Sequence, residues 1–151
     1  MAIAGKKKGE SYRVYCAVGD GEIEEGQIWE AAMFAAHYNL TNLCVIVDLN
    51  GLQIDGSTDE VMSSKPVDKK FEAFNFNVIT IDGHDFDQID DAFAKARACT
   101  DKPTAILANT VKGKGVSYME NNVSWHGNPP NDEQYEQAMA ELKAQRAELE
   151  A

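Results

Sequence analysis

Residues 19–52 limit most strongly what this chain can fold into. An apolar run that ends at Val18 gives way to Gly-Asp-Gly-Glu at positions 19–22, and a second apolar run stops at Asn50. Between them, residues 27–38 carry apolar side chains at helical spacing. A strand, a helix and a second strand predict parallel strands whose carboxyl ends share one edge of an open sheet, where ligands bind.

The side chains expected at this edge suit a metal-bridged diphosphate. Asp20 and Asn50 each offer an oxygen to a hard cation such as Mg²⁺, which fills its remaining positions with phosphate oxygens and water. Gly19 and Gly21 let backbone N–H groups approach a phosphate and tolerate strained backbone angles. A glycine turn with an exposed aspartate is the alternative for this tripeptide alone, and the strand-end Asn50 favours the ligand site.

The rest of the chain continues the alternation of strands and helices. Strands are expected at 12–18, 43–47, 77–81 and 104–109, and helices at 27–38, 67–74, after the N-cap Asp85, and from 131 onward. This order predicts an α/β fold, a parallel sheet with helices on both faces. We expect one domain over 1–151, with 131–150 as a peripheral helix and 51–65 as a functional loop.

Composition excludes several classes of partner. The 151 residues carry a formal charge of −11, which argues against nucleic acid and anionic membranes. No stretch approaches the roughly 20 apolar residues of a membrane span, and no signal peptide is evident. Cys16, Cys44 and Cys99 lack metal-binding spacing, so we expect reduced, mostly buried thiols in a cytoplasmic protein.

The N-terminus reads as the end of a helix. Residues 1–5 resemble a last helical turn capped by Gly5, and three lysines follow near its negative end. A helix end without a preceding helix leads us to expect that an upstream segment is missing.

The motif residues resemble those of a known family. Gly-Asp-Gly-Glu at 19–22 followed by Asn50 is similar to the thiamine diphosphate motif, and residues 25–32 and 50–56 resemble the transketolases. The chain is most similar to the N-terminal, diphosphate-binding subunit of split transketolases. The resemblance implies a partial thiamine diphosphate-binding, Rossmann-like fold, whose upstream phosphate-contacting stretch and active-site histidines are not found here.

The resemblance also implies two cofactors, thiamine diphosphate and Mg²⁺, and a set of site residues. The expected metal ligands are Asp20, Asn50 and the backbone carbonyl of Leu52; the expected cofactor-binding residues are Gly19, Asp20, Gly21, Asn50, Ile54, Lys112 and His126; the expected catalytic residues are His126, Glu25 and Glu30.

Several of these residues also have plainer interpretations. Lys112 taken alone reads as a surface lysine, and a lone loop histidine such as His126 is usually a surface residue; the family motifs around both favour the cofactor site. Glu25 and Glu30 are commonly solvated at such positions, whereas in the family they form a carboxylate network across a dimer interface. His84 matches no catalytic histidine, and we expect it to be structural.

The implied activity is transfer of a two-carbon ketol unit between sugar phosphates. It would need a second copy of this chain and a pyrimidine-binding transketolase subunit, so we expect no activity from the chain alone. Deoxyxylulose phosphate synthase and 2-oxo acid dehydrogenase E1 subunits use a similar motif, and a non-catalytic assembly subunit is a further alternative. A nucleotide-binding Rossmann protein is disfavoured because no G-x-G-x-x-G opens a helix after a strand.

Overall fold

The computed structural model describes residues 1–150 and leaves out Ala151, the last residue of the expected domain. Four parallel strands form one sheet in the order β1-β2-β6-β5. Their bounds are Val14–Gly19 for β1, Leu43–Leu49 for β2, Asn77–Asp82 for β5 and Thr104–Asn109 for β6. The expected α/β architecture is therefore confirmed, with every strand within two residues of its predicted start and end.

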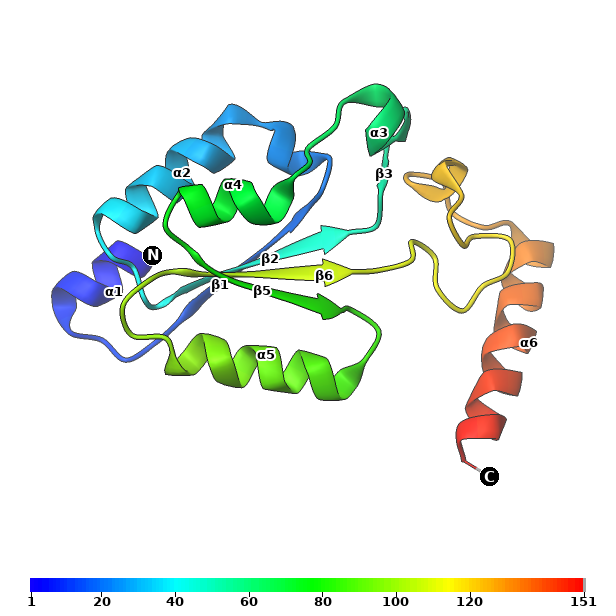
Figure 1. Cartoon of the computed structure of the whole chain (residues 1–151). Coiled ribbons are helices and arrows are strands. Elements are labelled where there is room, and N and C mark those ends of the chain that lie inside the picture. Colours follow the sequence, from blue (N-terminus) through cyan, green and yellow to red (C-terminus); the bar gives the residue numbers. More distant parts are fainter. Residues whose placement is uncertain (151) are drawn as a thin grey trace.

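Helices cover both faces of the sheet. Helices α2 (Gly26–His37) and α4 (Val67–Ala73) lie on one face, and α5 (Phe86–Ala98) lies on the other (Figure 1). Asp85 caps α5 by accepting the backbone N–H groups of Asp87 and Gln88, as its sequence predicts. The core on the first face includes Phe71, whose ring packs against those of Trp29 and Phe76.

The register of the strands brings their carboxyl ends together. Gly19 of β1 pairs with Asp48 of β2, and Leu49 of β2 pairs with Asn109 of β6. Strand β6 is buried from Thr104 to Ala108. Central parallel strands are buried on both faces. The backbone positions of the polar residues that follow them are therefore well defined.

The expected functional loop at 51–65 contains regular structure. A two-stranded hairpin, β3 (Leu52–Gln53) with β4 (Gly56–Ser57), leads into the short helix α3 (Thr58–Val61). Gly51 begins the hairpin with φ of 75°, a conformation that favours glycine. The buried Thr58 donates its backbone N–H to the Gly51 carbonyl at 2.9 Å, which closes the loop on itself.

The N-terminal helix corrects one expectation. Helix α1 runs from Ala2 to Lys8 and ends at Gly9, which has φ of 69° and donates to the Gly5 and Lys6 carbonyls. Gly5 is inside the helix and not its cap. A Cβ at Gly5 would lie 2.6 Å from the Tyr12 ring, so the tyrosine packs directly against this glycine.

Two 3₁₀ turns and a long helix complete the described chain. The turns are η1 (Glu22–Glu24) and η2 (Val123–Trp125), and helix α6 spans Asp132–Leu149. Asn131 and Gln134 form the capping box that starts α6, in agreement with the helix expected from 131 onward. Among the described residues, no helix combines the length and the apolar character needed to cross a bilayer.

The cysteines only partly match their predicted burial. All three are free, and Cys44 is buried, but Cys16 is exposed and Cys99 is half-buried. Cys16 lies on β1, an edge strand whose residues Tyr15 to Ala17 are exposed in this chain. The prediction of burial was wrong for Cys16 because β1 is an edge strand.

We expect thiol alkylation at pH 8 to distinguish these sites. Burial raises the pKa of the Cys44 thiol from 9.0 to about 11, so about one part in a thousand is thiolate, the reactive form. Cys16 should react in the native protein and Cys44 only after unfolding, as mass spectrometry of alkylated peptides would show. Equal native rates at Cys16 and Cys44 would contradict the burial of Cys44.

Candidate functional site

One cleft at the carboxyl edge of the sheet collects the predicted cofactor and metal residues. Its volume is about 420 Å³. Its lining includes all eight residues predicted to hold the cofactor or the metal: Gly19, Asp20, Gly21, Asn50, Leu52, Ile54, Lys112 and His126. Residues that are more than 100 positions apart in the chain therefore meet as the motifs predicted.

Asp20 is the buried acid at the base of this cleft, with 3% of its surface exposed. Its carboxylate accepts the backbone N–H of Gly51 at 2.6 Å and that of Gly21 at 3.0 Å. Burial raises the pKa of Asp20 above its ordinary value, the two N–H groups lower it in part, and the nearby charge of Asp48 raises it further. A cation bound nearby would stabilise the ionised form of this carboxylate.

Asn50 and the hairpin that follows it form the facing wall. The Asn50 side-chain oxygen accepts the Leu52 N–H at 3.0 Å, which fixes the amide beside Asp20. Ile54 lies near the tip of the hairpin and is 68% exposed, so its apolar side chain is free to contact a ligand. This wall therefore offers the oxygens of Asn50 and Leu52 as metal ligands and the Ile54 side chain as an apolar contact.

Gly21 of the motif has a packing role that the sequence did not predict. Neither Gly19 nor Gly21 has a positive φ, so neither uses the left-handed backbone conformation that glycine tolerates. A Cβ on Gly21 would lie 2.8 Å from Cβ of Gln53, so this glycine lets the hairpin approach the turn after β1. Gln53 secures that approach by donating to the Glu24 carboxylate at 3.0 Å.

Lys112 and His126 reach the cleft from the loop after β6. Lys112 is half-buried, and its ammonium makes no ion pair within the described part of the chain. His126 follows η2 and is exposed. His84 instead accepts the Val111 N–H at 2.8 Å, which supports the structural role expected for it.

Sequence reasoning missed three further polar residues of the cleft, Glu22, Asp48 and Gln53. Asp48 hydrogen-bonds the Thr110 hydroxyl, and Glu22 accepts the Gly19 N–H at 3.1 Å. Asp48 could have been found, because it lies near the carboxyl end of β2, two residues before Asn50. Gln53 had no such signal.

Charge in the cleft is predominantly negative. Three carboxylates, those of Asp20, Glu22 and Asp48, face the single ammonium of Lys112. Within residues 1–150, no three His, Cys, Asp or Glu side chains are grouped so that they could hold a metal by themselves. A diphosphate would therefore be repelled unless a cation bound with it, and that cation would draw ligands from amide, carbonyl and phosphate oxygens.

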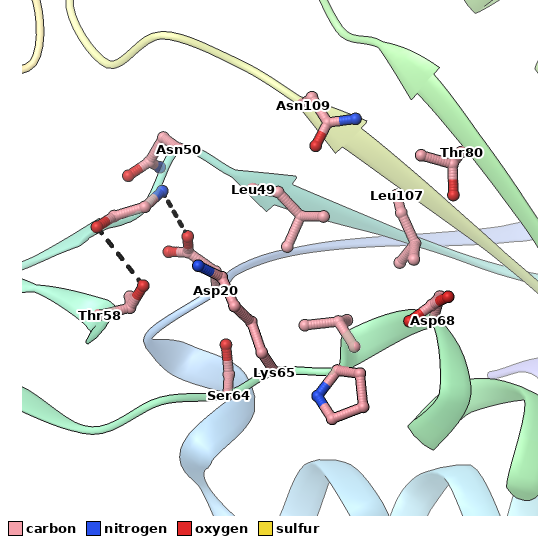
Figure 2. A pocket seen from close by; sticks show the side chains of 13 residues that line it. Asp20, Leu49, Asn50, Thr58, Ser64, Lys65, Asp68, Thr80, Leu107 and Asn109 are labelled. Carbon is pink, nitrogen blue, oxygen red and sulfur yellow. Dashed lines mark hydrogen bonds between the residues drawn. The ribbon is translucent and has the colours of Figure 1, made fainter.

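A second hollow of about 570 Å³ is lined by Asp20 and Asn50 on one side and by the start of α4 on another. Figure 2 shows Ser64, Asp68 and Thr80 around it, with Leu49 and Leu107 also in its lining. Asp20 and Asn50 line both this hollow and the cleft, so the two spaces share these residues.

Glu25 and Glu30 do not line the cleft. Glu25 is the N-cap position of α2 and Glu30 lies on the same helix, and both are exposed. Glu30 borders a shallow depression with Met33, Phe34, His37 and Tyr38. Their expected role at an interface between chains stays a prediction.

The fold and cleft define the class: an open α/β protein with its ligand site at the carboxyl ends of parallel strands. The chain belongs to the transketolase family, because residues 4–148 match the family described as "Transketolase, thiamine diphosphate binding domain".

Two curated relatives and one solved structure show the extent of this similarity. A subunit of the apulose-4-phosphate transketolase of Actinobacillus succinogenes is 41% identical over 95% of this chain and 51% of its own length. The 6-deoxy-6-sulfo-D-fructose transketolase subunit SqwG of a Clostridium species is 42% identical over 97% and 54%. A crystal structure of transketolase from Campylobacter jejuni superposes with a TM-score of 0.88 at 32% identity, covering 94% of this chain and 23% of that one. The chain thus spans about half the length of these two curated relatives.

Proposed function

We propose that this chain is the thiamine diphosphate- and Mg²⁺-binding part of a transketolase. Together with a pyrimidine-binding subunit, it would transfer a two-carbon ketol unit between sugar phosphates. The observation that carries this proposal is the single cleft in which all eight residues predicted from the family motifs meet.

The donor set of the cleft fits the metal. The Asp20 carboxylate, the Asn50 amide oxygen and the Leu52 carbonyl would supply hard oxygen ligands, which Mg²⁺ prefers. The hydrogen bond from Leu52 N–H to Asn50 already orders two of these groups. The raised pKa of Asp20 marks a buried charge that a cation would stabilise.

The part of the cleft near Lys112 fits the diphosphate. The Gly21 N–H and the Lys112 ammonium would contact its oxygens, while Ile54 would pack against the thiazolium ring. When bound, the cofactor supplies the electron sink for carbon–carbon bond cleavage and formation. His126 would hydrogen-bond the diphosphate or a substrate hydroxyl and move a proton at its imidazole nitrogen.

Other chains would complete the active site. The described residues supply the diphosphate end alone, so we propose that the isolated chain does not turn over substrate. Exposed Met33 and Phe34 on α2 and Tyr38 at its C-cap lie beside Glu30 and offer a surface for a second copy. Glu25 and Glu30 would meet carboxylates of the partner there. Relatives that are themselves named as subunits support the need for a further chain. Three free thiols agree with a cytoplasmic location.

Thermal unfolding with added ligands tests the proposal. Mg²⁺ and thiamine diphosphate together should raise the melting temperature, because a ligand at 100 times its Kd adds about 2.7 kcal/mol. Thiamine diphosphate with EDTA should have little effect, since the cleft is anionic.

Ketol transfer from xylulose 5-phosphate to ribose 5-phosphate should appear only when a pyrimidine-binding subunit is present. Turnover by the chain alone, or no response to the ligand pair, would contradict the proposal.

A further inference from the structure

The loop that carries Lys112 and His126 is attached to helix α6. This segment, residues 110–128, is called the cleft loop below. It runs from the end of β6 away from the sheet and lies beside α6, which stands beyond the carboxyl edge of the strands (Figure 1). Ala138 is the one buried residue described in α6, so this helix adds little to the core.

Glu141 is the strongest attachment between α6 and the cleft loop. Its carboxylate accepts the backbone N–H of Ser117 at 2.7 Å and the Ser117 hydroxyl at 2.6 Å. Gln137, one turn earlier on the helix, donates to the same carboxylate at 2.8 Å. Two charge-assisted hydrogen bonds to one residue fix both its position and its orientation.

Two further contacts lie on either side of this one. The Gln145 side chain donates to the Gly115 carbonyl at 2.8 Å, and the Tyr118 hydroxyl donates to the Gln134 carbonyl at 2.6 Å. Consecutive turns of α6 therefore hold the loop positions from 115 to 118.

This held segment is connected to His126. The Trp125 indole donates to the Tyr118 carbonyl at 2.9 Å, and the centroids of the two rings lie 5.1 Å apart. The next residue, His126, donates its N–H to the Val123 carbonyl at 3.0 Å. Fixing Tyr118 thus fixes the turn that presents the imidazole.

The same segment is connected to Lys112. The Asn121 N–H donates to the Lys112 carbonyl at 2.9 Å, and Val116 is buried. A Cβ on Gly113 would lie 2.6 Å from the Met119 backbone, so the two arms of the loop are in close contact there. Lys112 cannot move independently of residues 116–121.

We propose that α6 is a positioning element, in which Glu141 holds the cleft loop so that Lys112 and His126 face the cleft. The proposal rests on the proposed function, since it assigns a purpose to α6 in forming the same diphosphate site. It identifies Glu141 as a positioning residue that touches neither cofactor nor substrate.

The test compares Glu141→Ala, Glu141→Gln and the control Glu136→Ala. Glu136 lies on the same helix and is exposed, and no hydrogen bond of its carboxylate is present in the described chain. Hydrogen exchange of the ligand-free chain measures the order of residues 112–128. Calorimetry with Mg²⁺ and thiamine diphosphate measures the dissociation constant.

Glu141→Ala should speed exchange in the cleft loop and weaken binding by about tenfold, the size typical of lost supporting contacts. Exchange in β2 and β6 should stay unchanged, which shows that the fold persists. Glu141→Gln keeps one acceptor oxygen and should recover part of both losses, while Glu136→Ala should match the wild type.

The outcomes separate the two proposals. Unchanged loop exchange in Glu141→Ala, or faster exchange with unchanged affinity, would overturn the positioning role while leaving the proposed function intact. A wild-type chain that binds neither cofactor would overturn the proposed function, and the role of Glu141 in presenting a diphosphate site would fail with it; loop exchange would then report only a structural attachment.

Discussion

Asp20→Ala is expected to abolish the rise in melting temperature that Mg²⁺ and thiamine diphosphate give the wild-type chain. Asp20 is the one buried carboxylate of the cleft, which Asn50 and Leu52 also line. Losing about 2.7 kcal/mol of ligand stabilisation, the value at 100 times Kd, corresponds to about 5–10 °C for a domain of this size.

The measurement must be the ligand-dependent difference within each variant, because two effects oppose each other in the ligand-free protein. Alanine leaves the N–H groups of Gly21 and Gly51 without their acceptor, which costs about 1–3 kcal/mol for each group that stays buried. It also removes a buried charge whose pKa is raised, and this offsets part of that cost.

Asp55→Ala is the matched control for Asp20→Ala. Asp55 is an exposed carboxylate of the neighbouring hairpin turn and does not line the cleft. It should keep the full ligand-dependent rise. If Asp20→Ala keeps that rise as well, the cation does not bind at this carboxylate and the assignment of the cleft is wrong.

The sheet could be predicted from sequence because its signals are local. Apolar runs bounded by Gly, Asp or Asn located all four strands, and the capping residues Asp85 and Asn131 located two helix starts. Strand order was not predicted, since it depends on which strands pair across the chain. This is why Cys16 was expected to be buried: nothing in its own segment says that β1 is an edge.

Only the cleft residues that belong to recognisable motifs could be predicted. Asp20 and Asn50 follow adjacent strands, so their meeting follows from parallel topology, whereas Lys112 and His126 came from family resemblance. The glycine with a positive φ at the strand end is Gly51, whereas sequence reasoning noted a tolerance of strained backbone angles only for Gly19 and Gly21.

Contacts between polar residues of solvated segments were beyond sequence reasoning. Residues 131–150 read as a peripheral helix because Glu, Ala, Gln and Lys dominate the segment, and Ala138 is the one buried residue described in it. The hydrogen bond from Ser117 to Glu141 joins two residue types, serine and glutamate, that are also found elsewhere on the surface of the chain. No spacing or pattern distinguishes such a pair before the backbone is known.

Gly113→Ala is expected to weaken the binding of Mg²⁺ and thiamine diphosphate by at least about tenfold. Gly113 has φ of 75°, and its added Cβ would lie 2.6 Å from the Met119 carbonyl oxygen. An alanine in this conformation costs about 1–2 kcal/mol, and the contact with backbone cannot be relieved by a side-chain rotation. The loop must therefore shift, and Lys112 is the adjacent residue.

Gly127→Ala separates this effect from the mere loss of a glycine in the loop. Gly127 follows His126, has no positive φ, and its added Cβ would meet no atom within 4 Å. Calorimetric titration should give a wild-type dissociation constant for Gly127→Ala and a weakened one for Gly113→Ala. The melting temperature of ligand-free Gly113→Ala should fall by only a few degrees, since the four strands do not depend on this loop. Wild-type affinity in Gly113→Ala would mean that the loop conformation, and with it the placement of Lys112, does not govern binding of the diphosphate.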